Sequence, residues 1–163
     1  MLSDTIFDFN KTSNTDHWNV VDDAVMGGKS SGLFYLDTAG KGVFEGHVSL
    51  ENNGGFSTVK YSFDAISTKG FSKISFKVKG DGKAYQFRIK RKSTDKYAYI
   101  NYFNSTKDWE TFELTLSEMY PTFKGRKLDM PNYDQDSIEE VAFLIANKKA
   151  EDFKLEIDSI VLS

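Results

Sequence analysis

The chain has 163 residues, a length that fits one domain, and it carries 21 Lys and Arg against 24 Asp and Glu. The resulting net charge of −3 provides no general attraction to phosphate backbones or to anionic lipid surfaces. Cysteine is absent, which excludes disulfides, thiolate metal sites and cysteine nucleophiles.

The chain begins with MLSDTIFDFNK, which lacks both the basic n-region and the apolar h-region of a secretory signal. Its longest apolar run is VAFLIA, residues 141–146, far short of the roughly 20 residues that a membrane helix requires. We therefore expect a cytoplasmic protein without membrane insertion.

The stretch WNVVDDAVMGG, residues 18–28, places Asp22 and Asp23 at a strand end, just before Gly27 and Gly28. Neighbouring residues on a strand point to opposite faces, which disfavours a catalytic pair of carboxylates. The pattern favours a structural corner, in which a carboxylate pairs with a cation and the glycines supply the positive φ of a turn. A ligand anchor is the alternative interpretation of the two aspartates.

Period-two alternation predicts half-buried strands from residue 44 to residue 50 and on both sides of the sequence GDG in residues 73–92. A type I′ turn at positions 81–82 would place Phe76 opposite Phe87 and keep all apolar side chains on one face. We therefore predict a hairpin over 73–92, and a loop that crosses between two sheets is the alternative.

Further strands are predicted in GLFYLD, FSTVKYSF, KYAYINYF, WETFELTL, EEVAFLIA and FKLEIDSIVL. Roughly ten short strands with turn signals between them are typical of an all-β sandwich or barrel, here a single domain over residues 1–163. Residues 117–137 contain both prolines and no alternation, so we predict a long surface excursion there.

Arginine is scarce, because only three of the 21 basic residues are arginine, at positions 88, 91 and 126. A guanidinium suits planar, two-pronged hydrogen bonding to a carboxylate. We therefore predict that Arg88 or Arg126 forms a partly buried ion pair with one of the aspartates at 22 and 23. Removing one member of such a pair should destabilise the fold strongly.

Trp109 is unusual because it has the parity of the polar residues in its strand. It either faces a groove or closes a strand end with one edge covered.

A strip of basic residues beside the tyrosines of KYAYINYF suggests a surface for single strands of nucleic acid. Such strips are more often solvated strand faces, so we predict no nucleic-acid partner. The strip consists of Lys77, Lys79, Lys83, Arg88, Lys90 and Lys92.

Catalytic and metal motifs are not recognisable in the chain. The two histidines, His17 and His47, are too few and too poorly spaced for a zinc site, and neither lies near a nucleophile motif. The glycine pairs match neither a Walker loop nor a dinucleotide fingerprint. We predict no catalytic residue, metal or cofactor, and a hydrolase or nucleotide-dependent enzyme is disfavoured.

Five stretches together resemble the complex I intermediate-associated protein family: WNVVDDAVMGGKSSG (18–32), FEGHVSLENNGGFSTV (44–59), VKGDGKAYQFRI (78–89), FKGRKL (123–128) and FKLEIDSIVL (153–162). The resemblance implies a jelly-roll sandwich of the galactose-binding-like type over nearly the whole chain. It also implies a non-enzymatic assembly or chaperone-type module with a protein partner, since the mitochondrial members act as assembly chaperones for the NADH:ubiquinone oxidoreductase.

A carbohydrate-binding module is the alternative function. Sandwiches of this shape often hold a sugar or another small polar ligand with an exposed aromatic residue and Asp, Asn and Arg side chains. On that hypothesis the ligand-binding residues would come from the same set as the structural ion pairs, namely Asp22, Asp23, Arg88, Arg126 and Trp109.

Overall fold

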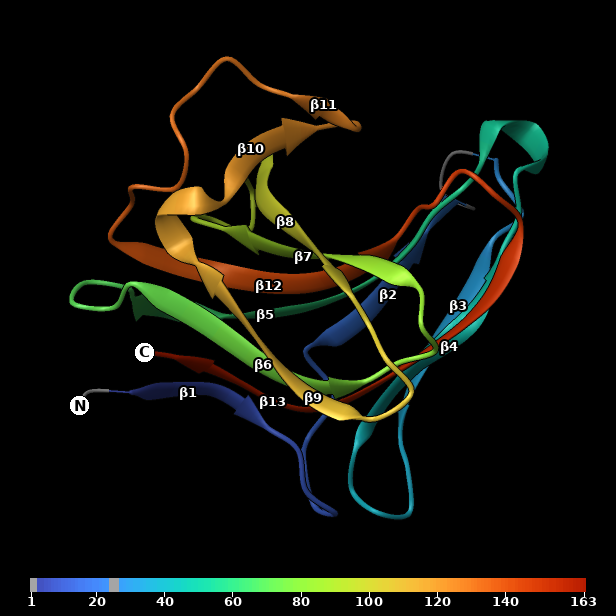
Figure 1. Cartoon of the computed structure of the whole chain (residues 1–163), viewed down its shortest axis with the longest axis horizontal. Helices are drawn as coiled ribbons and strands as arrows, with labels where there is room; N and C mark the ends of the chain where they lie inside the picture. Colours follow the sequence, from blue (N-terminus) through green and yellow to red (C-terminus); the bar gives the residue numbers. More distant parts are fainter. Residues whose placement is uncertain (1–2, 24–26) are drawn as a thin grey trace.

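The structure, a computed structural model, describes residues 3–23 and 27–163, which fold into two packed β-sheets (Figure 1). The strands are β1 (Asp4–Asp8), β2 (Trp18–Asp22), β3 (Ser31–Leu36), β4 (Gly42–Val48), β5 (Ser57–Ser67), β6 (Lys73–Lys79), β7 (Ala84–Lys90), β8 (Ala98–Asn104), β9 (Trp109–Thr115), β10 (Tyr120–Phe123), β11 (Arg126–Lys127), β12 (Ser137–Ile145) and β13 (Glu151–Leu162). Among the described residues, the 3-10 turns η2 (Glu51–Asn53) and η3 (Leu116–Glu118) lie in the connections between strands. Within these described ranges, no helix is long and apolar enough to cross a membrane.

The strands form one six-stranded and one seven-stranded sheet. The six-stranded sheet has the order β3-β4-β13-β6-β9, and β1 also pairs with β13. The seven-stranded sheet has the order β11-β10-β8-β7-β12-β5-β2. All strand pairs among the described residues are antiparallel. The predicted all-β sandwich is therefore confirmed, with a few more strands than expected.

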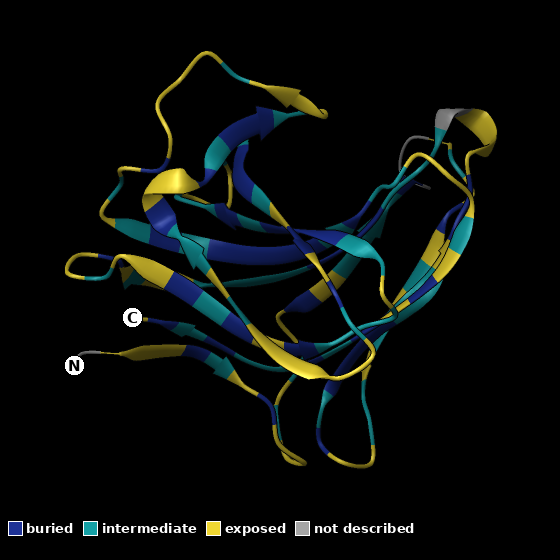
Figure 2. Cartoon of the chain, viewed as in Figure 1, coloured by how far each residue is buried: buried dark blue, intermediate teal, exposed yellow. Residues whose placement is uncertain are grey.

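An aromatic core fills the space between the two sheets. Phe76 of β6 stacks on Phe87 of β7 with ring centroids 4.5 Å apart, and Phe143 of β12 meets Phe87 edge to face at 5.2 Å. Figure 2 shows buried and more exposed residues alternating along many of the strands. Each such ring pair contributes about 0.5–1.5 kcal/mol beyond the burial of apolar surface. The side-chain parity predicted from the sequence is thus the parity of the core.

The predicted hairpin over residues 73–92 is wrong, and the alternative loop between sheets is correct. β6 pairs with β13 and β9, whereas β7 pairs with β12 and β8. Phe76 and Phe87 do face each other, but across the sandwich rather than across a strand pair. The basic strip is therefore not one surface, because Lys77 and Arg88 lie on different sheets.

The predicted surface excursion over residues 117–137 is only partly correct. It contains η3, β10 and β11, and β10 pairs with β8 at the edge of the seven-stranded sheet. Met119 and Tyr133 are buried, and the Tyr133 hydroxyl lies 2.7 Å from Thr68 Oγ1. The segment forms an arm over one face of the sheet, drawn in orange in Figure 1. We call β10, β11 and the turn between them the β10–β11 arm.

Candidate functional site

A groove of about 1030 Å³ lies on the outer face of the seven-stranded sheet. Its floor consists of side chains of β7, β8, β10 and β12 that point away from the core. One wall is the part of the β10–β11 arm beyond β10, namely the turn and β11, and the other is the segment from Leu50 to Phe56, drawn in teal at the upper right of Figure 1. The floor residues are Gln86, Arg88, Ile100, Tyr102, Tyr120, Thr122 and Leu144.

A row of hydrogen bonds crosses the floor of this groove. Arg88 Nη1 donates to Gln86 Oε1 at 2.8 Å, and Gln86 Nε2 donates to the Tyr102 hydroxyl at 3.1 Å. Gln86 and Arg88 share a face because they are two residues apart on β7, and Tyr102 lies opposite Gln86 on β8. The row orients the Tyr102 side chain, which is 49% exposed in the groove.

The carboxylate that acts on Arg88 is Glu140, which sequence reasoning did not select. Burial lowers the pKa of Arg88, and the charge of Glu140 opposes this shift. Glu140 is 5% exposed, and burial raises its pKa, although Lys90, Lys60 and Arg88 act in the other direction. The two residues approach each other because β7 and β12 are neighbours in the sheet despite their separation in sequence.

Asp23 is fully buried at the end of β2, and its partners are hydrogen-bond donors rather than an arginine. Its carboxylate accepts from the Ser30 hydroxyl and from the backbone N–H groups of Ser30 (2.8 Å), Gly55 and Phe56 (3.2 Å). Burial raises the pKa of Asp23, but these hydrogen bonds together outweigh it, so the pKa is lowered. The predicted ion pair is therefore wrong for Asp23. Asp22 accepts a hydrogen bond from the N–H of Gly32 at 3.3 Å.

The hydrogen bonds of Asp23 attach the groove wall to the sandwich. Gly55 and Phe56 line the groove, and Ser30 Oγ also accepts from the N–H of Ser49 at 2.9 Å, where this wall begins. A Cβ atom at Gly28 would lie 2.4 Å from Asp23 Oδ1, and one at Gly54 would lie 2.5 Å from Oδ2. Both positions thus require glycine so that the chain can pack against the carboxylate.

Gly27 has the positive φ that the sequence predicted, +87°, and its carbonyl accepts a hydrogen bond from Asn52 Nδ2 at 3.1 Å. The predicted positive φ is wrong for Gly28, which is needed instead because a Cβ atom there would collide with Asp23. Residue 26, the methionine of the Met-Gly-Gly stretch, lies outside the described residues.

Trp109 and Arg126 do not line the groove. Trp109 is 37% exposed on β9, at the edge of the other sheet, with Lys41 Nζ 5.9 Å from the ring centroid. Arg126 is exposed on β11, opposite Phe123. Of the seven residues selected from the sequence, only Arg88 contributes a side chain to the groove, whereas Asp23 positions its wall.

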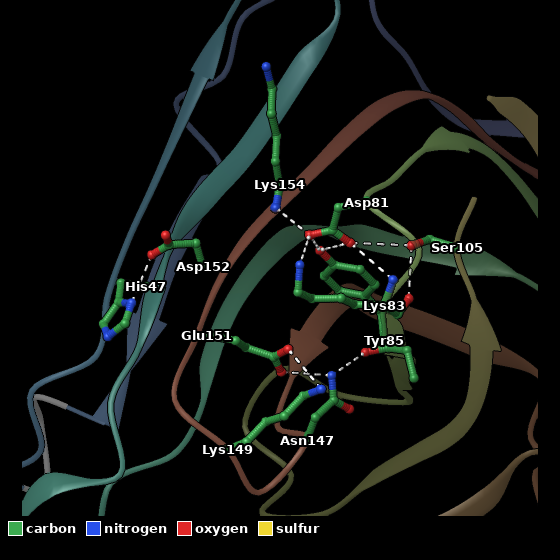
Figure 3. A network of polar contacts seen from close by, with 11 residues as sticks. His47, Asp81, Lys83, Tyr85, Ser105, Asn147, Lys149, Glu151, Asp152 and Lys154 are labelled. Atoms are coloured by element: carbon green, nitrogen blue, oxygen red, sulfur yellow. Dashed lines mark hydrogen bonds and ion pairs between the residues drawn. The ribbon is translucent and has the colours of Figure 1, made fainter. Parts of the chain in front are cut away.

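A second polar cluster connects the two sheets where β6 leads into β7 (Figure 3). Asp81 accepts hydrogen bonds from the Tyr85 hydroxyl at 3.0 Å and from the N–H groups of Lys83 (3.2 Å) and Lys154 (2.9 Å). Burial and the charge of Asp81 raise the pKa of Tyr85. Because its partners lie on β7 and β13, in different sheets, this cluster stabilises the sandwich.

The two packed sheets define a class of protein, a β-sandwich domain with a groove on one outer face. A family 11 carbohydrate-binding module from Clostridium thermocellum, solved in complex with a beta-1,3-1,4-mixed-linked tetrasaccharide, matches with a TM-score of 0.73 and 22% identity over 98% of this chain and 94% of that one. An agarase matches with a TM-score of 0.66 and 12% identity over 99% of this chain and 24% of the agarase. At these identities, the similarity establishes the jelly-roll fold and not the ligand.

The sequence matches the family described as Complex I intermediate-associated protein 30 (CIA30) over residues 7–157. The chain belongs to this family, as the five stretches in the sequence indicated. The Drosophila melanogaster protein named Complex I intermediate-associated protein 30, mitochondrial, is 28% identical over 185 residues, covering 98% of this chain. This chain spans 62% of the length of that relative.

Proposed function

We propose that the protein is a non-enzymatic binding module that holds a segment of a protein partner in the groove of the seven-stranded sheet during assembly of a larger complex. The observation that carries the proposal is the groove, with its preformed floor and a wall attached through Asp23. Membership of the CIA30 family supports an assembly role, because the Drosophila relative is named for its association with complex I intermediates.

The chemistry of the groove supports binding rather than catalysis. The described residues that line it include neither a carboxylate nor a histidine, the side chains most often used for general acid–base catalysis. The Thr122 hydroxyl, which also lies in the lining, donates its proton to the backbone carbonyl of Ala98 at 3.4 Å, and no carboxylate or histidine base lies beside it in the described lining. The lining as a whole presents hydrogen-bond donors and apolar surface to a ligand.

The proposal is tested by site-specific photo-crosslinking in the cells that make the protein. A photoreactive phenylalanine analogue replaces Tyr102 on the groove floor or, in the control, Tyr35, which is 39% exposed on β3 of the other sheet. We expect a small set of protein adducts from position 102 only. An absence of adducts at position 102, or the same adducts from both positions, would refute the groove as the partner site.

Carbohydrate binding is a second candidate, favoured by one observation within the groove. Tyr102 exposes its ring next to the Gln86 amide, and an aromatic face beside an amide is a common arrangement around a sugar ring. The family 11 module with the same fold was solved with a tetrasaccharide. Titration calorimetry with that tetrasaccharide tests this function: measurable heat that disappears in Tyr102→Ala supports it, and no heat excludes that sugar.

Two further expectations from the sequence remain proposals. We propose that the protein is cytoplasmic, which fractionation of the source cells checks. We also propose that it binds no nucleic acid, since the basic residues of the sequence strip are divided between two sheets. Micromolar binding of single strands at physiological salt would contradict the second proposal.

A further inference from the structure

The groove is lined by four cationic side chains and, among its described lining residues, by no carboxylate. Arg88 lies on the floor, Lys124 and Lys127 lie on the β10–β11 arm, and Lys148 lies in the turn after β12. This concentration of positive charge occurs in a chain whose net charge is −3. The charge of the described groove lining is therefore opposite in sign to the net charge of the protein.

None of these four cations belongs to an ion pair among the described residues. Lys127 Nζ lies 5.5 Å from the centroid of the Tyr120 ring, and Lys124 Nζ lies 5.4 Å from that of Phe123. The guanidinium of Arg88 donates one hydrogen bond, to Gln86 Oε1, which leaves other N–H groups for a ligand. The cations are thus arranged against aromatic and amide groups, which do not neutralise them.

The half-buried position of Arg88 strengthens the case for an anion. A cation that is partly removed from water gains most from a ligand that carries opposite charge and accepts several hydrogen bonds. Glu140 lies on the same face of the sheet, next to Lys90, and acts on Arg88, but it does not line the groove. A ligand with carboxylates would therefore bring the negatively charged acceptors that the described groove lining lacks.

A neutral sugar fits this lining less well than an acidic ligand. Sugar hydroxyls both donate and accept, and the lining offers strong donors without a carboxylate to accept from them. Lys127 also stands over the face of Tyr120, which reduces the aromatic surface on which a sugar ring could stack. Aliphatic side chains instead form part of the lining, and Leu50 in the wall is 46% exposed.

We infer that the ligand of the groove is an acidic segment of a protein partner whose carboxylates meet Arg88 and the groove lysines, while its apolar side chains contact Leu50 and Leu144. This inference rests on the proposed function and names the chemistry of the partner. Charge complementarity supports it, together with the mixture of cations and aliphatic surface in one groove.

The test measures binding of fluorescent peptides by anisotropy. The probes are repeats of Glu-Glu-Leu, with Gln-Gln-Leu and Lys-Lys-Leu repeats of equal length as controls. We expect only the acidic peptide to bind, and its affinity to fall as salt rises toward about 0.15 M, because salt screens interactions between exposed charges. Oligogalacturonate of equal charge serves as the acidic sugar.

Matched protein variants locate the binding surface. Replacing Lys124, Lys127 and Lys148 together by Gln should weaken binding of the acidic peptide roughly tenfold or more, at about two- to fivefold for each exposed charge. The control replaces Lys11, Lys77 and Lys107 by Gln, which changes the net charge equally at exposed positions outside the groove lining. Arg88→Gln should weaken binding by roughly tenfold or more, because a charge-assisted hydrogen bond is lost.

Three results would overturn the inference: equal binding of the three peptides, equal losses in the groove and control variants, or tighter binding of oligogalacturonate than of the acidic peptide. These results differ from a failure of the proposed function. If photo-crosslinking at position 102 captures a partner while the acidic peptide does not bind, the groove is the partner site and only its assigned chemistry is wrong. If neither occurs, both proposals fail.

Discussion

Charged side chains on the six-stranded sheet and in the groove of the seven-stranded sheet differ in their partners within the chain. On the six-stranded sheet, several charged groups are paired: Lys73 Nζ lies 2.8 Å from Glu113 Oε1, and the Tyr35 hydroxyl donates to Glu45 at 2.7 Å. In the groove of the seven-stranded sheet, the lining cations lack such partners among the described residues. Internally paired charges suit a scaffold surface, whereas the groove keeps its charges available to a ligand.

The largest change in stability should follow from removing Asp23, the side chain that attaches the groove wall to the sandwich. Asp23→Ala leaves the hydroxyl and the amide groups around the carboxylate without their acceptor, so we expect a loss of about 3–5 kcal/mol in the free energy of unfolding, measured with urea. Asp152→Ala is the control on the other face, since its side chain is 91% exposed beside His47. We expect that change to cost about 0–1 kcal/mol. Equal losses would show that Asp23 does not anchor the wall.

The substitution Asp23→Asn keeps the shape of the side chain but removes its negative charge, so it tests the contribution of the charge alone. The pKa of Asp23 is lowered from 3.8, so its contribution to stability is complete above about pH 4 and is lost as the pH falls through the folded-state value. At pH 7 we expect the variant to be less stable by about 2–3 kcal/mol, since hydrogen bonds to a charged acceptor are replaced. This difference should narrow in urea titrations at pH 3. A constant difference would mean that the Asp23 charge does not contribute.

Substitutions at the adjacent glycines 27 and 28 should change stability less, and one of them serves as a control for the other. Gly28→Val places a side chain against the Asp23 carboxylate, and we expect a loss of about 1–3 kcal/mol. Gly27→Ala meets no atom within 4 Å but must keep a positive φ, which costs about 1 kcal/mol. Melting of Gly28→Val at the wild-type temperature would disprove the close packing at that position.

The parity of the core could be predicted from the sequence, but the order of the strands could not. Alternation placed Phe76 and Phe87 on the core side, because period two follows from strand geometry alone. The GDG segment is compatible with a hairpin turn and with a crossing loop. The strand pairing shows that the crossing is correct. Asp81 also accepts a hydrogen bond from the N–H of Lys154, and this contact depends on where β13 lies.

The groove was less predictable because its residues come from strands that are distant in sequence. The scarcity of arginine drew attention to Arg88, yet its neighbour Glu140 follows from the pairing of β7 with β12, which no local pattern reveals. Alternation also placed Leu50 on the apolar face of its strand. It is exposed because β4 ends at Val48 and the chain then turns into the groove wall.

The smallest change in stability is expected for Glu140, the buried carboxylate next to the groove. Burial raises the pKa of Glu140 above 4.5, which means that the folded protein binds a proton there more readily than the unfolded chain. Wild-type stability should therefore fall as the pH rises from about 4.5 through the folded-state pKa, and Glu140→Gln should remove this decrease. At pH 7 the variant should match or exceed the wild type by about 1 kcal/mol, although the ion pair with Lys90, 3.9 Å away, is lost. Without this carboxylate beside the groove, the surroundings of Arg88 become more positive, so binding of the acidic peptide should strengthen. If Glu140→Gln instead weakens that binding and destabilises the fold, the carboxylate holds Arg88 in place, and the positive groove depends on a buried acid.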